Sequence, residues 1–542
     1  MLKHRMLRLQ PIRLLARRLG SEPVREDVWR LSWVSGGRVA RLALPLNVLA
    51  NLDFGAPAAE RDIGRGLEKY FIESVAYKRV RSGAKTIILG NRGSGKSAIF
   101  QILARRERSA GSHVIELSPE DYSYELLSST MTSEKSGSWV KHGAYAAAWK
   151  YLIYILVMKE ISKKGMRLKK GAATAIYRYV RDNHGADQMG RLAVLISYLR
   201  RLEAIKLGPI EAGIKARELD KLYKLEEIHH LLPALKEVLA RQRVVVLVDE
   251  LDRGWDSSED AKAFVAGLFQ ACVSINGLHE NLSVYISLRQ ELYDDIPALY
   301  EDAQKYRDLL EIIRWDEDSL LKLITRRIRH SAREKGYGDP DLEKSSDTAW
   351  WSAVFAAPPG HPADTCFRYM IDRTLYRPRE IIQFCTEVVE LARSRTSGLP
   401  LPYAAISWAE RSYSEERAKD IAAEYRFQYP GLLSVFEVFR GRSPTFDREN
   451  LQLLCLELAT GGLPTGDTSS WLPDRDPDDL IDILWHVGFL EGQPDGGVIS
   501  GNPHRSFLGV HQVQHLNLAL VQYFRVHAMF RAYLGMAEET PG

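Results

Sequence analysis

The apolar positions of the chain fall into short continuous runs that alternate with longer amphipathic segments. Val244 to Val248 (VVVLV) is a run of β-branched residues, as expected for a strand buried on both faces of a parallel sheet. Similar runs and helical spacings predict strands over 86–89, 113–117, 282–288 and 309–315, and helices over 64–80, 96–106 and 260–275. Strands that alternate with helices indicate an α/β protein with a parallel sheet.

Long helical stretches interrupt and follow this pattern. Residues 122–240 are charge-rich and mostly helical in pattern, which predicts an insertion before the strand at 244–248. Helices dominate 317–425, and GRSPTF (441–446) has the composition of a linker. We therefore expect four parts: a basic N-terminal segment and lead-in over 1–50, an α/β core with the insertion over 51–316, a helical lid over 317–440, and a small domain over 441–542.

Composition is that of a globular protein, with 45% hydrophobic and 27% charged residues. The chain has 74 Lys and Arg, six of them in residues 1–20, so the remainder has 68 basic against 70 acidic residues. Bulk charge therefore does not indicate a nucleic-acid binder. Residues 1–20 contain no acid and are interpreted either as a basic amphipathic helix for a membrane or phosphate backbone, or as a solvated terminus.

The cysteines and the apolar runs indicate in which cellular compartment the protein is expected. The four cysteines lack any CxxC spacing, which argues against a disulfide framework or zinc cluster and fits a reducing compartment. The most apolar run, 151–158, is too short to span a bilayer, and residues 1–20 lack the apolar core of a secretory signal. We expect a cytoplasmic protein without stable membrane insertion.

The segment from Gly90 to Ser97 (GNRGSGKS) fits the GxxxxGK[ST] pattern in full, between a predicted strand and a predicted helix. Its glycines allow left-handed backbone that points N–H groups at phosphates, and the helix N-terminus adds partial positive charge. Lys96 is expected to neutralise the β- and γ-phosphates, and the Ser97 hydroxyl to bind Mg²⁺. The predicted nucleotide-binding residues are Gly90, Asn91, Arg92, Gly93, Ser94, Gly95, Lys96, Ser97 and Ala98.

Two carboxylates follow the apolar strand at 244–248. Asp249 is predicted to lie at the sheet edge where open α/β sheets bind ligands, and to hold Mg²⁺ through water. Glu250 is the candidate base that orients the attacking water. Acids after a strand are also common as solvated caps, but the P-loop upstream favours the catalytic interpretation. Asp249 follows Lys96 by 153 residues, a separation that the helical insertion accounts for.

Two arginines complete the predicted catalytic set. Arg289 follows the strand at 282–288, where Ser287 could position the water and Arg289 could meet the γ-phosphate or a neighbouring acid. Arg379 stands at a helix start marked by Pro378, from which a lid could reach the γ-phosphate. Solvated arginines at a strand end and a helix start are the competing interpretations. The predicted catalytic residues are Glu250, Lys96, Arg289 and Arg379, and the metal ligands are Ser97 and Asp249.

The segment DRGWD (252–256) allows two interpretations. Its charges could contact a neighbouring subunit or a bound partner. It could equally be the loop that starts a helix, with the tryptophan as an aromatic anchor.

These motifs together resemble bacterial P-loop ATPases of the AAA+/STAND class: GNRGSGKS, VVVLVDELDRGWD, SVYISLR and YRPRE. LDFGAPAAE, DELDRGWD and the EIIRWDEDSL strand around Trp315 are similar to one family of such ATPases that is often encoded beside phage-defence genes. The similarity covers about 50–430 and leaves out the insertion and the basic terminus. It implies that Arg289 occupies the sensor-1 position and Arg379 the sensor-2 position.

The C-terminal stretch resembles the winged-helix domain appended to these ATPases. The resemblance lies in LIDILWHVGFL (480–490) and FRVHAMFRAYL (524–534), which suggest a helix, a turn at Gly488 and a late strand. Such a domain either reads DNA or packs against the nucleotide domain as a switch. His527 is interpreted either as a nucleotide sensor or as a structural histidine at a strand end.

We therefore expect an α/β P-loop NTPase fold with a helical lid and a C-terminal winged-helix-like domain. The protein would bind and hydrolyse ATP with Mg²⁺ and act as a nucleotide-controlled switch or assembly factor. The resemblance implies antiphage defence, as a homo-oligomer with a separate effector protein. Two alternatives stay open: a DNA-stimulated motor or loader, and a scaffold that holds ATP without turnover.

Overall fold

The structure is a computed structural model of the 542-residue chain. It describes residues 44, 47–117, 138–163, 171–184, 228–252, 255, 257–297, 299, 306–336, 344–396, 398–463, 470–473, 475–494, 507–513 and 516–536. The basic segment 1–20 predicted from the sequence lies outside these residues.

Five parallel strands form the sheet of the core, in the order β2-β3-β4-β1-β5. They span Ile87–Leu89 (β1), His113–Leu117 (β2), Val244–Val248 (β3), Leu282–Leu288 (β4) and Leu310–Ile312 (β5). The predicted parallel sheet is confirmed. The last strand is shorter than the predicted 309–315: it ends at Ile312, so Trp315 is not part of it. Asp316 then caps the next helix by accepting a hydrogen bond from the Ser319 amide.

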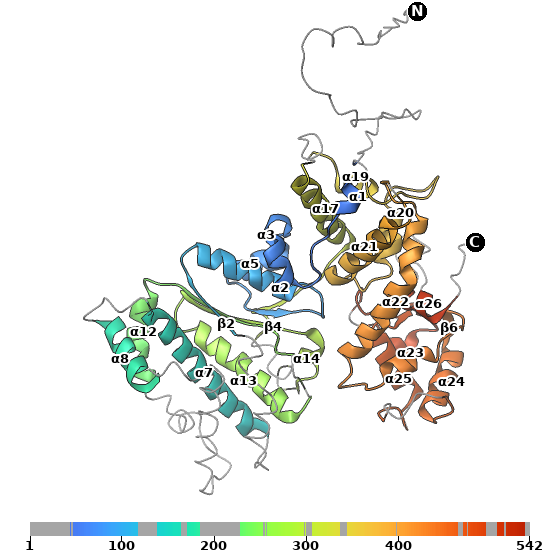
Figure 1. The fold of residues 1–542 in the computed structure, drawn as a ribbon. Coiled ribbons are helices and arrows are strands. Elements are labelled where there is room, and N and C mark those ends of the chain that lie inside the picture. Colours follow the sequence, from blue (N-terminus) through green and yellow to red (C-terminus); the bar gives the residue numbers. More distant parts are fainter. Residues whose placement is uncertain are drawn as a thin grey trace, which may run out of the picture.

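Helices cover both faces of the sheet (Figure 1). Ile88 and Val245 pack against α4 (Val75–Arg81) and α5 (Lys96–Ser109), whereas Ile87 and Val244 pack on the opposite face, against α7 (Ser138–Ser162) and α13 (Glu259–Asn276). Successive side chains of a strand point to opposite faces, so each strand contributes to both layers. This explains why these strands are continuous apolar runs rather than alternating ones.

The predicted helical insertion is represented by three described helices, α7, α8 (Ala172–His184) and α12 (Leu232–Leu239). Helix α7 packs along α13, where the Trp149 indole donates to the Phe264 carbonyl oxygen at 3.1 Å. The insertion therefore contributes one of the two helical layers of the core rather than a separate appendage.

The single helix predicted over 64–80 is wrong. The chain instead forms η1 (Ile63–Arg65), α3 (Leu67–Tyr70) and α4, after the short helices α1 (Asn47–Asn51) and α2 (Ala59–Asp62). Gly66 adopts a left-handed conformation at φ 101°, which ends η1. Ser74 then starts α4 as an N-cap that accepts from the Tyr77 amide at 3.1 Å. Apolar spacing alone did not reveal these breaks.

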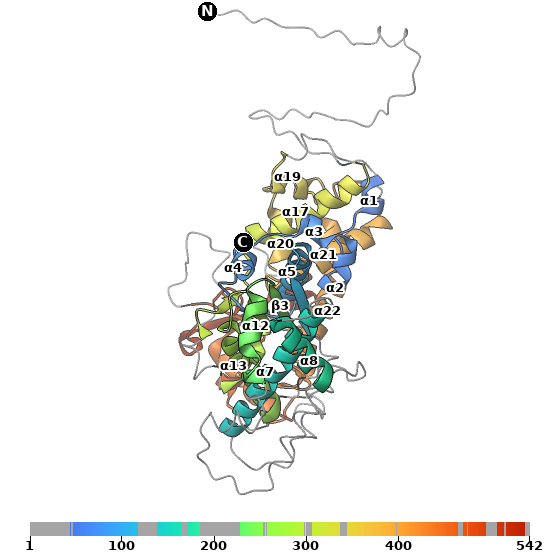
Figure 2. The same ribbon diagram turned by 90° about the vertical axis from the view of Figure 1, so that its left-hand side faces the viewer.

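Helices follow the core, as predicted. The core itself still includes α14 (Gln290–Asp294). The helices after it, which we call the lid helices, are α17 (Glu317–Glu334), α19 (Asp347–Ser352), α20 (Thr365–Ile371), α21 (Pro378–Arg393) and α22 (Ala404–Glu424). Helix α1 packs with them, against α21. Figure 2 shows α1, α17 and α19 together at one end of the molecule, with α7, α8 and α13 toward the other.

The C-terminal elements run in the order α23 (Leu432–Glu437), β6 (Thr445–Asp447), α24 (Arg448–Ala459), α25 (Pro477–His486), β7 (Leu490–Gly492), η6 (Leu518–Leu520), β8 (Tyr523–Val526) and α26 (Ala528–Leu534). Their strands form an antiparallel sheet in the order β6-β8-β7. Helix α23 shares the core of α24 to α26, and α26 packs along α22. The domain boundaries proposed from the sequence stay a prediction.

Within the described ranges, no helix is both long and apolar enough to cross a membrane. The four cysteines are buried free thiols.

Candidate nucleotide site

Three of the predicted site segments leave the sheet at the same edge. Leu89 of β1 lies opposite Leu288 of β4, and β4 in turn pairs with β3, whose Val248 lies opposite Ile286. The segments beginning at Gly90, Asp249 and Arg289 therefore start side by side, although they are far apart in the sequence. This is the carboxyl edge, where open α/β sheets bind ligands.

The P-loop turns from β1 into α5 through two left-handed glycines. Gly93 has φ 81° and Gly95 has φ 99°, and Gly95 is the N-cap of α5. A Cβ atom on Gly93 would lie 2.9 Å from the Arg379 Cβ, so the loop and the lid approach each other here more closely than any other residue would permit. Lys96 and Ser97, in the first turn of α5, line the cavity. The amides of a helix's first turn have no partner within the helix, which makes this a favourable place for an anion.

The Lys96 ammonium group folds back over the loop. Its Nζ donates to the carbonyl oxygens of Gly90 at 2.5 Å and Asn91 at 3.1 Å. Burial lowers its pKa, while the carboxylates of Glu291 and Asp252 act in the opposite direction. A half-buried cation beside acids and carbonyl oxygens, on the wall of a cavity, is well placed to exchange these contacts for phosphate oxygens.

Asp249 lies at the end of β3, half-buried on the wall of a cavity. Burial raises its pKa, and contacts from the Ser287 hydroxyl, the Glu250 amide (2.9 Å) and the Ser97 hydroxyl oppose that shift. A carboxylate beside two hydroxyls is an oxygen donor set that suits Mg²⁺, which usually takes one or two protein ligands together with phosphate oxygens and water. Among the described residues no group of three or more His, Cys, Asp and Glu is arranged to hold a metal.

Glu250 lines a cavity of about 510 Å³ together with the other predicted catalytic residues, Lys96, Arg289 and Arg379. Its backbone is left-handed, at φ 55°, which is unusual for a residue with a long side chain. Strained conformations of this kind persist only where the surroundings impose them, and they concentrate at functional sites. The roles assigned to these residues stay predictions, but the structure brings all four to one cavity.

Arg289 lies at the end of β4 and forms an ion pair with Asp252. A second carboxylate, Glu291, lies 3.8 Å from its guanidinium group. Of the partners considered from the sequence, a neighbouring acid is therefore the one observed. Trp255 is buried in the core beneath this loop, and its indole donates to the Ser257 hydroxyl at 3.0 Å. Trp255 thus anchors the loop; Arg253, Gly254 and Asp256 lie outside the described residues.

Arg379 reaches the P-loop from the second position of α21. Its amide donates to the Gly93 carbonyl oxygen at 3.4 Å, and its side chain lines the cavity. Burial and the neighbouring Arg92 both lower the pKa of Arg379, so the two guanidinium groups repel each other unless an anion lies between them. The lid arginine therefore lies beside the P-loop on the wall of the cavity, and not on an outer surface.

Several cavity residues were not predicted from the sequence: Glu60, Glu291, Glu424, Arg426 and Phe427. Burial and the nearby Glu424 raise the pKa of Glu291 to about 7, against the effect of Arg289 and Lys96. Glu291 follows a strand end by three residues, a signal that could have identified it. No local signal marks Glu424, which ends α22 and reaches the core only through the folding of the lid.

A second, smaller cavity of about 120 Å³ adjoins the first. It shares Glu60, Gly93, Lys96, Ser97 and Arg379 with the first cavity. Most of its other walls are apolar side chains of the 56–72 segment, Trp315 and the lid, with Asp62 and Arg327 as charged members. The Trp315 indole donates to the Ser94 carbonyl oxygen at 2.8 Å. The P-loop thus has a polar cavity on one side and a partly apolar one on the other.

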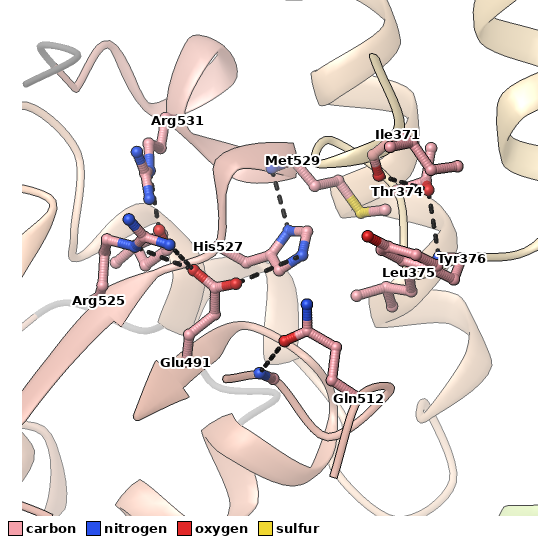
Figure 3. Close-up of polar contacts among 12 residues, drawn as sticks. Ile371, Thr374, Leu375, Tyr376, Glu491, Gln512, Arg525, His527, Met529 and Arg531 are labelled. Carbon is pink, nitrogen blue, oxygen red and sulfur yellow. Dashed lines mark hydrogen bonds and ion pairs between the residues drawn. The ribbon is translucent and has the colours of Figure 1, made fainter. Parts of the chain in front are cut away.

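His527 does not line either of these two cavities. It caps α26, where its Nδ1 accepts from the Met529 amide at 3.1 Å, and its Nε2 lies 4.0 Å from Glu491 Oε1 (Figure 3). Glu491 in turn forms a two-pronged pair with Arg525 at 3.0 and 2.8 Å. Burial and the nearby arginines lower the pKa of His527 to about 3, so the ring is neutral. The structural interpretation of His527 fits these contacts.

The core has the arrangement of a P-loop nucleotide-binding fold: the glycine-rich turn joins a central parallel strand to a helix, and the acid after β3 faces the same cavity. Residues 318–422, which make up the lid helices, match the family model described as the FunZ-associated C-terminal helical domain. This match covers only part of the chain.

The chain is also similar to the transposon gamma-delta 80.3 kDa protein of Escherichia coli (strain K12), with 23% identity over 412 residues. The alignment covers 74% of this chain and 56% of that relative, so the chain spans just over half of the relative's length. Among solved structures, the Aeropyrum pernix ORC2 protein in its ADPNP–ADP complexes aligns over 90% of this chain and 95% of that chain, with 11% identity and a TM-score of 0.36. Its ADP form aligns over 86% and 90%, with 12% identity and a TM-score of 0.25.

Proposed function

We propose that the protein is a Mg²⁺-dependent ATPase that acts as a nucleotide-controlled switch or assembly factor. The observation that carries this proposal is the gathering of Lys96, Glu250, Arg289 and Arg379 around one polar cavity at the carboxyl edge of the sheet. A P-loop alone would suit any phosphate ligand. An acid and two arginines from three other segments suit a triphosphate whose last phosphate is attacked by water.

Each residue has a distinct part in this reaction. The amides of Gly93 to Ser97 and the Lys96 ammonium group would hold the phosphates, and Ser97 and Asp249 would hold the ion. Bound Mg²⁺ supplies charge neutralisation at the phosphate oxygens. Glu250 would orient the attacking water, and Arg289 and Arg379 would stabilise charge at the γ-phosphate. We assign the nucleoside to the smaller cavity, because apolar walls beside the P-loop suit a base better than a phosphate.

The lid supplies the switch. The end of α22, at Ala423 and Glu424, and the residues after it, Arg426 to Gln428, line the larger cavity. A change at the γ-phosphate would thus act directly on the segment that carries the C-terminal domain. We propose that a homo-oligomer and a separate effector protein respond to this change in the cytoplasm of a bacterium. Antiphage defence is the setting suggested by the sequence resemblance; the name of the E. coli relative suggests a mobile genetic element instead.

DNA is the alternative partner. The order helix, strand, helix, helix and two further strands, from α23 to β8, is that expected of a winged-helix domain. In that arrangement α25 would be the helix that enters the major groove. Its exposed and half-buried positions include Asp478, Asp479 and Asp482, which would repel DNA phosphates. This charge favours the packing role over DNA recognition through α25.

Steady-state ATP hydrolysis by the purified chain tests the proposal, alone and with single- or double-stranded DNA, beside Glu250→Gln. Turnover that depends on Glu250 and ignores DNA supports the switch. Turnover that DNA raises severalfold, with a steep salt dependence, supports the motor or loader. ATP binding without turnover supports the scaffold, and a chain that binds no nucleotide contradicts all three.

A further inference from the structure

Five residues, Leu375 to Arg379, run from the loop between α20 and α21 into the first turn of α21 and touch two different parts of the molecule; we call them the connector. At one end Leu375 belongs to the apolar core of the C-terminal elements, where a Cβ atom on Gly488 would lie 3.0 Å from the Leu375 side chain. The Tyr376 ring stacks on His511, with ring centroids 5.1 Å apart and planes at 25°. Figure 3 shows Leu375 and Tyr376 facing the His527 side of this junction.

The other end of the connector meets the P-loop. The Arg379 amide donates to the Gly93 carbonyl oxygen, and the Cβ position of Gly93 is within 2.9 Å of the Arg379 Cβ. Only two residues, Arg377 and Pro378, separate the ring that stacks on the C-terminal domain from the arginine in the phosphate cavity. Because the connection is this short, we expect a displacement of Arg379 to move Tyr376 as well.

Buried polar contacts hold the middle of the connector. The Arg377 guanidinium group donates to Glu424 Oε2 at 2.9 Å, and Glu380 accepts from the Leu375 amide at 2.6 Å. The side chains of Arg377, Glu380 and Glu424 are at most 7% exposed. Contacts of this kind are costly to break singly, because each leaves a buried charge without its partner.

Tyr376 itself has a left-handed backbone, with φ 55°, and its amide hydrogen-bonds to the Thr374 hydroxyl at 3.1 Å. Its hydroxyl donates to Glu317 Oε1 at 3.2 Å, at the start of the first lid helix. A bulky residue adopts this conformation only where its surroundings demand it. The stack on His511 and the Glu317 contact help to hold the side chain in place, together with a hydrogen bond to Gln512 and packing against the lid core.

We propose that Tyr376 is a positioning residue for Arg379, and that its stack on His511 couples the nucleotide state to the docking of the C-terminal domain. When the domain is docked, the ring is held, the left-handed turn is kept and Arg379 lies against the P-loop. When the nucleotide moves Arg379, the turn relaxes and the stack is released. Because coupling between two sites is reciprocal, undocking the domain must also change nucleotide affinity. The proposal rests on the ATPase function proposed above.

The test compares four variants of the full chain with the wild type, in the presence of ATP and Mg²⁺. Tyr376→Ala and His511→Ala remove the stack from opposite sides, and a third variant combines them. We expect each single variant to lower kcat by about 10- to 100-fold, the range for a misplaced catalytic group, with a much smaller change in KM. The double variant should be no slower than the slower single variant, because both remove one interaction. Tyr376→Phe keeps the ring and should restore most of the rate.

The control is Tyr523→Ala, which removes an exposed tyrosine of the same domain. A role of Tyr376 in stability alone would lower the melting temperature and leave kcat of the folded protein unchanged, which would overturn the proposal. Multiplicative losses in the double variant would also overturn it. Hydrogen exchange of residues 523–536 gives a second readout: a difference between ADP and a non-hydrolysable ATP analogue should be present in the wild type and absent in Tyr376→Ala. A wild type without turnover contradicts the ATPase proposal, whereas an unaffected Tyr376→Ala contradicts only this inference.

Discussion

The indole of Trp315 donates a hydrogen bond to the carbonyl oxygen of Ser94, 221 residues earlier in the chain, at 2.8 Å. The contact joins the segment after β5 to the P-loop, at the wall of the smaller cavity. Trp315→Phe should therefore weaken nucleotide binding by roughly 2- to 10-fold, since a hydrogen bond of this kind contributes about 1 kcal/mol. Calorimetric titration with ATP and Mg²⁺ measures it, with Trp408→Phe on α22 as the control. An unchanged Kd would mean that the loop keeps its shape without this contact.

Lys96→Ala should abolish measurable ATP binding while the fold is retained. The variant removes the cation nearest the phosphates, and the P-loop amides alone carry only partial charge. Binding is followed by the same titration and folding by thermal melting. Lys85→Ala, at a lysine whose ammonium group donates to the Asp308 carbonyl oxygen away from the cavity, is the matched control. Wild-type affinity in Lys96→Ala would contradict the assignment of the phosphate site.

Glu250→Gln should reduce turnover by roughly 10²- to 10⁴-fold, the usual effect of losing a positioned base, with little loss of ATP affinity. Glutamine keeps the size of the side chain and its strained backbone but cannot take a proton. Phosphate release measures turnover. Glu449→Gln, at an exposed acid on α24, serves as control. Full turnover in Glu250→Gln would show that another group orients the water.

Stability should respond to pH through Glu291, whose pKa burial and Glu424 raise to about 7. The folded state binds a proton that the unfolded state releases near pH 4.5, so this carboxyl makes the protein less stable as pH rises from about 5 to about 7.5. Glu291→Gln should remove that loss and be more stable than the wild type at pH 8, by about 1–3 kcal/mol. Chemical unfolding at pH 5.5 and pH 8 tests this. The lower pH is about one unit above the pKa of the unfolded state, and the higher pH is about one unit above the pKa of the folded state. Equal pH dependence of the two proteins would contradict it.

The opposite dependence is expected of His527, whose pKa burial and its arginine neighbours lower to about 3. The unfolded state binds a proton near pH 6.5, whereas the folded state binds it only near pH 3. The free energy of unfolding therefore decreases as pH falls from about 6.5 toward 3. Between about pH 7.5 and pH 5 the loss from this ring is about 2 kcal/mol. His527→Gln, which can still accept from the Met529 amide, should lose less stability over that interval. A variant as acid-sensitive as the wild type would contradict a neutral buried ring.

The core and its main motifs were predictable from the sequence alone. The strands at 113–117, 244–248 and 282–288 are found at the predicted residues, because a continuous apolar run between turns has one favourable local structure in an α/β chain. The P-loop was equally clear, since a fixed spacing of Gly, Lys and Ser between strand and helix serves one backbone geometry. Their common edge also followed, because parallel strands end on the same side.

Only the tertiary structure decided which distant residues complete the cavity. Glu424 and Phe427 reach it because α22 folds back over the core, and nothing in their local sequence distinguishes them from solvated helix-end residues. The breaks in the helix expected over 64–80 occur at Gly66 and Ser74. Both residues are compatible with a helix or a turn, and their tertiary surroundings determine which one forms. The placing of Arg379 in the site and of His527 away from it was settled in the same way. Local pattern determines the elements, whereas the packing of segments far apart in the chain determines which side chains meet, because that packing is a property of the whole fold.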